Sequence, residues 1–228
     1  MRFLDGDTKR SRVSSAGIPA FWGPQTDIDA EFVDGFATAI DAGYGLMKLA
    51  GQKLFEKAID MLGESPEGKS VAVFVGGGNN GGDGYALAGI LKNNGIDSVI
   101  YKVSDKMSDD GKYYMEIAEK LGVSIEYFDE NTNLNEYDVI VDCILGTGFV
   151  GEVHGKARDA IEAINKSNAY VISVDINSGM NGDTGEASLA VKSNLTVSIG
   201  YYKKGLFTEA SKKYIKEKTN VDIGIVLI

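Results

Sequence analysis

VAVFVGGGNNGGDG, from Val71 to Gly84, joins five consecutive apolar residues to a loop that holds six glycines in nine positions. A short, continuous apolar run is typical of a strand that is buried on both faces of a sheet. The glycines allow the backbone to turn tightly after this strand, and we expect a helix to follow from Gly84 to Asn94. A strand, a glycine-rich turn and a helix in this order are typical of the first unit of a Rossmann-like fold.

The same alternation of strands and helices continues toward the C-terminus. We predict further strands at 98–103, 123–128, 138–145, 169–176, 195–200 and 222–228, and helices at 109–121 and 156–166. Because parallel strands need crossover helices, this alternation predicts a three-layer αβα sandwich around a mostly parallel sheet. The run KYIKEK, residues 213–218, is expected to be a solvated helix face.

The N-terminal part of the chain precedes the first predicted strand. Residues 1–25 are irregular and polar and are expected to form an arm, which two amphipathic helices follow at 27–42 and 46–61. These helices and the aromatic pair Phe21–Trp22 could bury surface in a homodimer. We interpret residues 1–228 as a single domain, since this length suits one large α/β domain.

The composition argues against several classes of protein. The net charge of −10 comes without any basic stripe, which argues against a nucleic-acid partner. A single cysteine forms no intrachain disulfide, so the reducing cytoplasm is the expected location. A single histidine excludes a multi-histidine metal site within one chain. No apolar stretch is long enough to span a membrane, and the first residues lack the apolar stretch of a signal peptide.

In open α/β sheets the ligand crevice lies beyond the carboxyl ends of the strands. The first loop there, Gly76–Gly84, contains a GxGxxG pattern, and Asp105 ends the next strand where an acid could bind a ribose hydroxyl. GxGxxG alone is a weak signal, and a tight turn without a ligand is the alternative. The glycine backbone offers N–H donors to a phosphate, while the Asn and Asp side chains of this loop offer oxygen to a cation or a sugar.

Two aspartates, Asp142 and Asp175, each end a predicted buried strand and should converge at one crevice mouth. An uncompensated carboxylate at the end of an apolar strand is costly, so Asp142 needs a cation or several hydrogen-bond donors. The alternative is that Asp142 only caps the next turn. One aspartate could hold a cation while the other handles protons, each environment setting its pKa. Asp183 and Thr184 are expected merely to shape a turn.

Other residues with reactive side chains are interpreted as structural. Cys143 belongs to an apolar strand and is expected to be a small core residue rather than a nucleophile. His154 lies in a loop and is expected at the surface or in a hydrogen bond. Lys203 and Lys204 could meet a phosphate near a strand end, but we expect them to be solvated.

Three ordered motifs, VFVGGGNNGGDGYALAGIL, DVIVDCILGTGFVGEVHG and VISVDINSGMNGDTGE, closely resemble the NAD(P)H-hydrate epimerase family, also called the YjeF N-terminal domain family. The resemblance covers roughly Leu46 to the C-terminus. It implies an isomerase that serves nicotinamide nucleotide repair by interconverting the R and S epimers of hydrated NADH and NADPH. A separate dehydratase, specific for the S epimer, is then the expected functional partner.

The resemblance also implies which residues form the site. One potassium ion per subunit is expected on Asn80, Asp142 and Ser178. The hydrated cofactor is expected to be bound by Asn79, Asn80, Gly81, Gly82, Asp83, Gly146, Thr147, Gly148, Phe149, Val150, Gly151, Glu152 and Asp175. Asp175 is our choice of proton carrier at C6 of the nicotinamide ring, because it lies at the crevice and is not assigned to the cation.

The sequence departs from the family pattern at two positions. Lys48 stands where a glutamate is usual, which puts in doubt any ion pair or interface contact that the family makes there. Asn177 replaces the commoner proline of DxPSG, which leaves Asp175 and Ser178 intact.

Two other functions remain as alternatives. The first is a non-catalytic nucleotide-binding or scaffold protein of the same fold; the joint retention of Asn80, Asp142, Asp175 and Ser178 favours catalysis. The second is an NAD-dependent dehydrogenase, which GxGxxG and Asp105 support but in which DCILGTG and DINSG have no role. No basic cluster indicates a preference for the phosphorylated cofactor.

Overall fold

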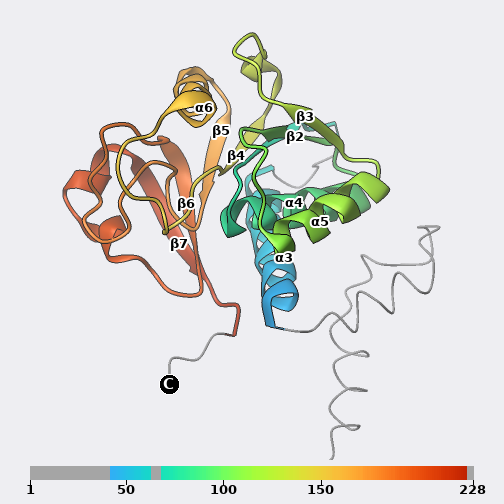
Figure 1. The fold of residues 1–228 in the computed structure, drawn as a ribbon, viewed down its shortest axis with the longest axis horizontal. Helices are drawn as coiled ribbons and strands as arrows, with labels where there is room; N and C mark the ends of the chain where they lie inside the picture. Colours follow the sequence, from blue (N-terminus) through green and yellow to red (C-terminus); the bar gives the residue numbers. More distant parts are fainter. Residues whose placement is uncertain (1–41, 63–67, 225–228) are drawn as a thin grey trace, which may run out of the picture. The chain divides into compact units, whose positions relative to one another are not determined.

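The computed structural model describes residues 42–62 and 68–224, and the strands in this range form one seven-stranded sheet (Figure 1). The strands are β1 (Val71–Val75), β2 (Ser98–Lys102), β3 (Ser124–Tyr127), β4 (Val139–Cys143), β5 (Tyr170–Val174), β6 (Ser193–Ile199) and β7 (Ile215–Val221). Their order is β3-β2-β1-β4-β5-β6-β7, and every neighbouring pair is parallel. The Rossmann-like α/β fold that the alternation predicts is confirmed.

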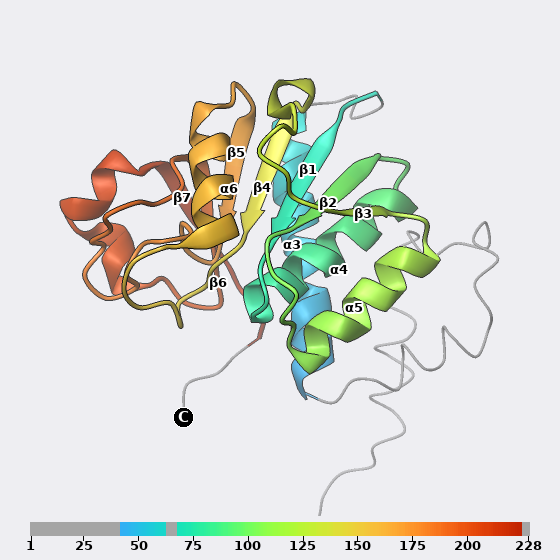
Figure 2. The same cartoon turned by 45° about the horizontal axis from the view of Figure 1, so that its top comes forward.

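Helices cover both faces of this sheet. On one side lie α3 (Ala42–Leu62), α4 (Asn79–Asn93) and α5 (Asp109–Lys120), and on the other lies α6 (Gly155–Lys166) (Figure 1). Short 3-10 turns lie at Leu134–Glu136 (η2), Lys204–Phe207 (η3) and Ala210–Lys213 (η4). Helices α4 and α5 run side by side (Figure 2).

Strand β1 shows how the sequence produces these three layers. All five of its residues are buried, and successive strand residues point to opposite faces. Phe74 packs in the same apolar cluster as Ile161 of α6, whereas Val75 faces α4 at Gly84. The continuous apolar run is therefore a consequence of helices on both sides of the strand.

Helix α4 begins earlier than the glycine pattern predicts. It starts at Asn79, five residues before the expected Gly84, so much of the glycine-rich segment forms the first turns of the helix. A Cβ atom on Gly84 would lie 2.8 Å from Val75 Cγ1 and 3.0 Å from Cys143 Cβ. The glycine at this position therefore serves close packing of the helix on the sheet, which outweighs its low helix propensity.

The C-terminal segment differs from the expectation. The run at 213–218 is not a helix face, because β7 covers Ile215–Val221 and pairs with β6. Lysine-rich strands are common at the edge of a sheet, where charged side chains hinder pairing with another chain. The strand expected at 222–228 is wrong for residues 222–224, which follow β7, and residues 225–228 lie outside the described residues.

The N-terminal expectations are only partly covered by the described residues. Helix α3 contains the predicted helix at 46–61. The arm at 1–25 and nearly all of the helix expected at 27–42 lie outside the described residues. None of the helices in the described part of the chain has the length and hydrophobicity needed to cross a membrane.

Candidate active site at the carboxyl edge of the sheet

The carbonyl oxygen of Leu145 is the point at which the three predicted loops meet. It accepts a hydrogen bond from Asn80 Nδ2 at 3.0 Å, from the first loop, and lies 3.2 Å from Ser178 Oγ, from the third. Leu145 itself follows β4 in the second loop, and its N–H lies 2.8 Å from Ser178 Oγ. The first and third loops thus contact the second, as expected of loops that follow the carboxyl ends of neighbouring parallel strands.

Asp142, at the end of β4, is fully buried among hydrogen-bond donors. Its two carboxylate oxygens accept from Ser173 Oγ at 2.8 Å, from the Ser178 N–H at 3.0 Å, from Ser178 Oγ at 2.5 Å and from the Ile144 N–H at 3.3 Å. Burial raises the pKa of Asp142, and these hydrogen bonds counteract the rise. The carboxylate therefore holds the second and third loops together and does not open into a cleft.

The side-chain oxygen of Asn80 is the one polar atom of this cluster without a hydrogen-bond donor. Asn80 is 7% exposed, and its Oδ1 is buried and unpaired while its Nδ2 is fixed by Leu145. A buried acceptor without a partner is costly, and a cation removes that cost. Asn80 Oδ1, the Asp142 carboxylate and Ser178 Oγ are all oxygen atoms, which hard cations prefer. These three side chains therefore fit the potassium ion that the family resemblance implies.

The start of α4 has no side-chain cap at this edge. Gly78 is the N-cap residue and offers no side chain to cap the helix. The Gly81 and Gly82 N–H groups both donate to Gly78 O, at 3.0 and 3.3 Å. Because an uncapped helix start attracts anions, a phosphate of a ligand is well placed here.

Gly76 has a different role from Gly78. A Cβ on Gly76 would overlap the carbonyl oxygen of Ile144, whereas a Cβ on Gly78 would meet nothing within 4 Å. The first glycine of the pattern thus allows β1 to approach the loop after β4, and Gly78 leaves open space at the helix start. Only Gly78 is placed as a ligand-facing glycine would be.

Asp175 is paired with Lys203, a contact that the sequence interpretation missed. Lys203 Nζ donates to Asp175 Oδ1, and it also donates to Ile199 O at 2.9 Å and to Ser198 Oγ at 3.3 Å. Both side chains of the pair are 17% exposed. The expectation that Lys203 is solvated is therefore wrong. The sequence does not distinguish Lys203 from the adjacent Lys204, of which only Lys204 is exposed in the structure.

The backbone of Asp175 is itself unusual. Its φ of +67° is the only positive value at a non-glycine residue in the described chain. Few side chains tolerate this region, and Asp and Asn are among those enriched there. The turn directs the carboxylate toward β6, where the Ile199 N–H donates to Oδ1 at 3.2 Å. A strained residue held by an ion pair at a loop edge is consistent with a functional role.

Asp83, in the first turns of α4, is electrostatically coupled to this pair. Burial raises the pKa of Asp83 well above its usual value, the negative charge of Asp175 raises it further, and Lys203 lowers it. Two carboxyl groups whose surroundings separate their proton affinities are a common basis of acid–base catalysis. The first and third loops therefore place Asp83 within electrostatic range of the Asp175–Lys203 pair.

The loop after β4 exposes five of its seven residues that are expected to bind the cofactor. Thr147, Gly148, Gly151 and Glu152 are exposed and Val150 is 82% exposed, while Gly146 and Phe149 are half-buried. Asn79 in α4 is also exposed, but Gly81 and Gly82 are buried. Gly81 and Gly82 have no side chain and their N–H groups already donate to Gly78 O, so the structure does not present them to a cofactor.

The hydrogen bonds and burial of several residues outside this cluster indicate structural roles. Asp183 and Thr184 belong to a turn in which both of their N–H groups donate to Asn181 Oδ1 at 2.9 Å. Cys143 is fully buried, and burial raises the pKa of its thiol well above its usual value, as expected of a core residue. Asp105 accepts a hydrogen bond from Tyr127 Oη at 2.7 Å.

The parallel sheet and the polar loops at its carboxyl edge define a Rossmann-like α/β protein with its candidate site at that edge. The chain belongs to the family described as YjeF-related protein N-terminus, whose model matches residues 43–205.

Curated relatives include proteins of two kinds. The NAD(P)H-hydrate epimerase of Oenococcus oeni is 38% identical over 160 residues, covering 69% of this chain and 75% of that protein. The NAD(P)H-hydrate epimerase of Levilactobacillus brevis is 34% identical over 203 residues, covering 88% and 93%. The bifunctional NAD(P)H-hydrate repair enzyme of Thermofilum pendens is 38% identical over 169 residues, covering 70% of this chain but 32% of that protein. The chain thus spans about a third of the bifunctional relative.

A solved structure supports the fold. The crystal structure of yeast ynu0 superimposes with a TM-score of 0.65, covering 92% of this chain and 84% of the yeast chain at 23% sequence identity. At this identity the likeness concerns the fold alone.

Proposed function

We propose that this protein is an NAD(P)H-hydrate epimerase, an isomerase that interconverts the R and S epimers of hydrated NADH and NADPH. The observation that carries this proposal is the cluster formed by Asp175, Lys203 and Asp83 beside the uncapped start of α4. It combines proton-transferring groups with a place for a phosphate. Relatives that are 34–38% identical bear the name of this activity.

The reaction needs a group that moves a proton at the C6 hydroxyl. Protonation of that hydroxyl lets the C6–O bond break with loss of water, while the lone pair of the ring nitrogen forms a C=N bond. Water then adds to the opposite face of the planar iminium and loses a proton, so that the net change is inversion at C6. The protein must hold the proton within hydrogen-bond reach of the oxygen.

Asp175 is the proposed proton carrier, and Lys203 positions it. Lys203 fixes one carboxylate oxygen of Asp175, which leaves Oδ2 to contact the substrate. Asp83 is the second group suited to the proton, because its raised pKa favours the neutral acid that donates. An acid and an ion-paired carboxylate are thereby available at one site.

Potassium is the proposed cofactor, held by Asn80, Asp142 and Ser178. When bound, it would supply positive charge beside the buried carboxylate and the pyrophosphate of the substrate. The exposed segment from Gly146 to Glu152 and the helix start from Asn79 to Asp83 are proposed to bind the dinucleotide.

Coupling to a dehydratase follows from the same proposal. Relatives from Thermofilum pendens and Coxiella burnetii are named as bifunctional NAD(P)H-hydrate repair enzymes. We propose that this chain acts in the cytoplasm with a dehydratase, and that it forms homodimers.

A coupled assay tests the function. R-NADHX is supplied with an S-specific dehydratase, and recovery of NADH is followed by absorbance with and without this protein. We expect catalytic amounts of the protein to accelerate recovery, and potassium to increase the rate. An unchanged rate would contradict the epimerase and favour a non-catalytic binding protein of the same fold.

A further inference from the structure

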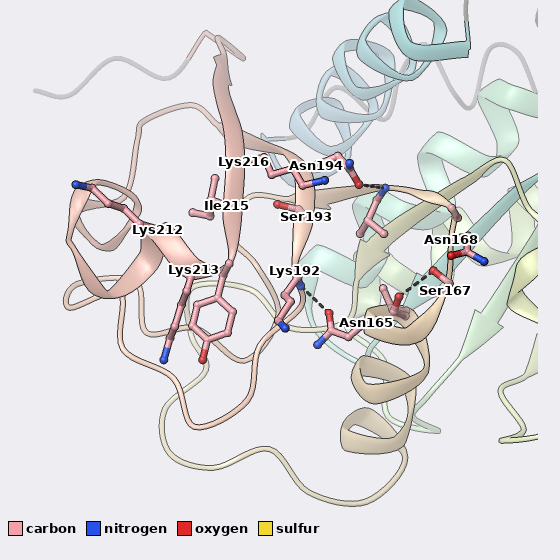
Figure 3. A pocket seen from close by; sticks show the side chains of 14 residues that line it. Asn165, Ser167, Asn168, Lys192, Ser193, Asn194, Lys212, Lys213, Ile215 and Lys216 are labelled. Carbon is pink, nitrogen blue, oxygen red and sulfur yellow. Dashed lines mark hydrogen bonds between the residues drawn. The ribbon is translucent and has the colours of Figure 1, made fainter.

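A cavity of about 380 Å³ lies at the opposite edge of the sheet from Asp175. It is formed where β5, β6 and β7 begin, and its walls include Val171, Ser193, Tyr214 and Lys216 (Figure 3). Ligands of such sheets normally bind at the carboxyl edge. Nothing in the proposed epimerase mechanism uses this cavity.

The lining of the cavity is basic although the chain is acidic. Four of its fourteen residues are lysines and none is acidic, in a chain of net charge −10. Lys212 pairs with Glu209 and points outward in Figure 3. No carboxylate in the described part of the chain forms an ion pair with Lys192 or Lys216. The four lysines are exposed, and their positive charges around one cavity attract an anion.

The polar frame around these lysines is fixed by hydrogen bonds. Asn165 Oδ1 accepts from the Lys192 N–H at 2.7 Å, and Asn165 Nδ2 donates to Ala190 O at 2.9 Å. Asn194 Oδ1 accepts from the Val171 N–H at 2.9 Å, and Lys216 points toward Asn194 in Figure 3. The lysines therefore project from a backbone whose position is set in advance, which lowers the entropic cost of binding a ligand.

We propose that this cavity binds a small molecule that carries phosphate groups, with Lys192 and Lys216 contacting the phosphates. Ammonium groups bind phosphate by charge-assisted hydrogen bonds. The volume lies within the usual range of small-molecule sites. Nothing in this assignment of the cavity depends on the proposed epimerase activity.

Asn177 connects the cavity to the loop that carries Asp175. Its Nδ2 lies 2.9 Å from Ser193 Oγ and 3.3 Å from Tyr214 O, and both of these residues line the cavity. Asn177 is fully buried and lies two residues after Asp175 and one before Ser178. A ligand that orders Ser193 and Tyr214 therefore also orders the loop of the candidate active site.

Binding of inorganic pyrophosphate to the full chain tests the site. Calorimetry should show a binding event that the double variant Lys192→Ala/Lys216→Ala weakens by at least about tenfold, because two charge-assisted hydrogen bonds are lost. Lys166→Ala is the matched control, since this exposed lysine of α6 does not line the cavity. Gly78→Asp is the second control, because the added charge would block pyrophosphate at the start of α4 and not here.

Hydrogen–deuterium exchange locates the bound pyrophosphate. We expect slower exchange at 192–194 and 213–216, and also at 176–178 through Asn177. Absence of binding to the wild type, wild-type affinity in the double lysine variant, or loss of binding in Gly78→Asp would overturn the site. Protection at the cavity without any change at 176–178 would support the site and overturn its connection to the loop. Circular dichroism of each variant checks that it is folded.

Discussion

Lys203 Nζ contacts Asp175 Oδ1 across 28 residues of sequence and joins the segment after β6 to the loop after β5. Both side chains are mostly buried. Truncating one partner of a buried pair leaves the other charge without compensation. This contact gives Asp175 a fixed orientation.

Replacing Lys203 tests whether the ion pair positions the proton carrier. Lys203→Met should lower the free energy of unfolding by about 3–5 kcal/mol and reduce kcat on the order of a hundredfold. Lys203→Arg retains the charge and should recover most of the stability. Urea unfolding and the pH profile of kcat measure the two effects. A methionine variant with the wild-type pH profile would show that Lys203 has no part in the proton transfer.

The raised pKa of Asp83 predicts how stability depends on pH. A carboxyl group whose folded pKa exceeds its unfolded value stabilises the fold below the unfolded pKa, which is about 4. That stability is lost as the pH rises from there through the folded pKa. The Asp83→Asn variant has no carboxyl group to ionise at this position, so it does not lose this stability. Its melting temperature should therefore rise relative to wild type as the pH increases.

Melting temperatures measured between pH 4 and pH 9 check this dependence. Asp159→Asn is the control, since Asp159 is exposed on α6 and should show no comparable trend. A constant difference between Asp83→Asn and wild type across this range would mean that Asp83 has an ordinary environment.

Potassium binding predicts a stabilisation that depends on Asn80. Melting is compared in potassium chloride and in tetramethylammonium chloride at equal ionic strength. Wild type should gain about 1.4 kcal/mol for each tenfold excess of potassium over its Kd, and Asn80→Ala should gain little because Oδ1 is removed. Equal stabilisation of both proteins by potassium would place the ion elsewhere.

The two glycines of the first loop predict opposite outcomes for the same substitution. Gly76→Ala forces a Cβ into the Ile144 carbonyl and should destabilise the fold by about 3 kcal/mol, with a further loss of expression. Gly78→Ala enters open space at a φ of −98° and should change stability by less than about 1 kcal/mol. Denaturant unfolding of the two variants makes the comparison. Similar losses in both would contradict the close approach of β1 to the loop after β4.

Much of the fold could be predicted from the sequence because burial on both faces leaves a simple pattern. The run VAVFV is apolar throughout, since Phe74 meets the α6 layer and Val75 meets α4. The start of α4 could not be predicted from propensity, because the glycine that disfavours a helix at position 84 is required by packing against Cys143. Tertiary contacts here outweigh the local preference.

The candidate site was predictable in part. Asp142 could be identified because a carboxylate at the end of an apolar strand requires compensation, but the sequence does not show that the compensation includes Ser173 and Ser178. Lys203 was missed because its partner lies far away in sequence and a second lysine stands beside it. KYIKEK was misread because a lysine-rich edge strand and a solvated helix face have the same composition.

The most direct measurement follows the inversion itself. Purified R-NADHX is incubated with wild type, with Asp175→Asn or without protein, and the two epimers are separated by chromatography over time. Asparagine tolerates the positive φ of Asp175 and retains the side-chain shape, but it leaves Lys203 without its counter-charge, so circular dichroism and binding of the substrate check that the variant is folded. We predict that wild type forms the S epimer rapidly while Asp175→Asn does not exceed the protein-free rate. Inversion by the variant at the wild-type rate, or none by wild type, would contradict the account.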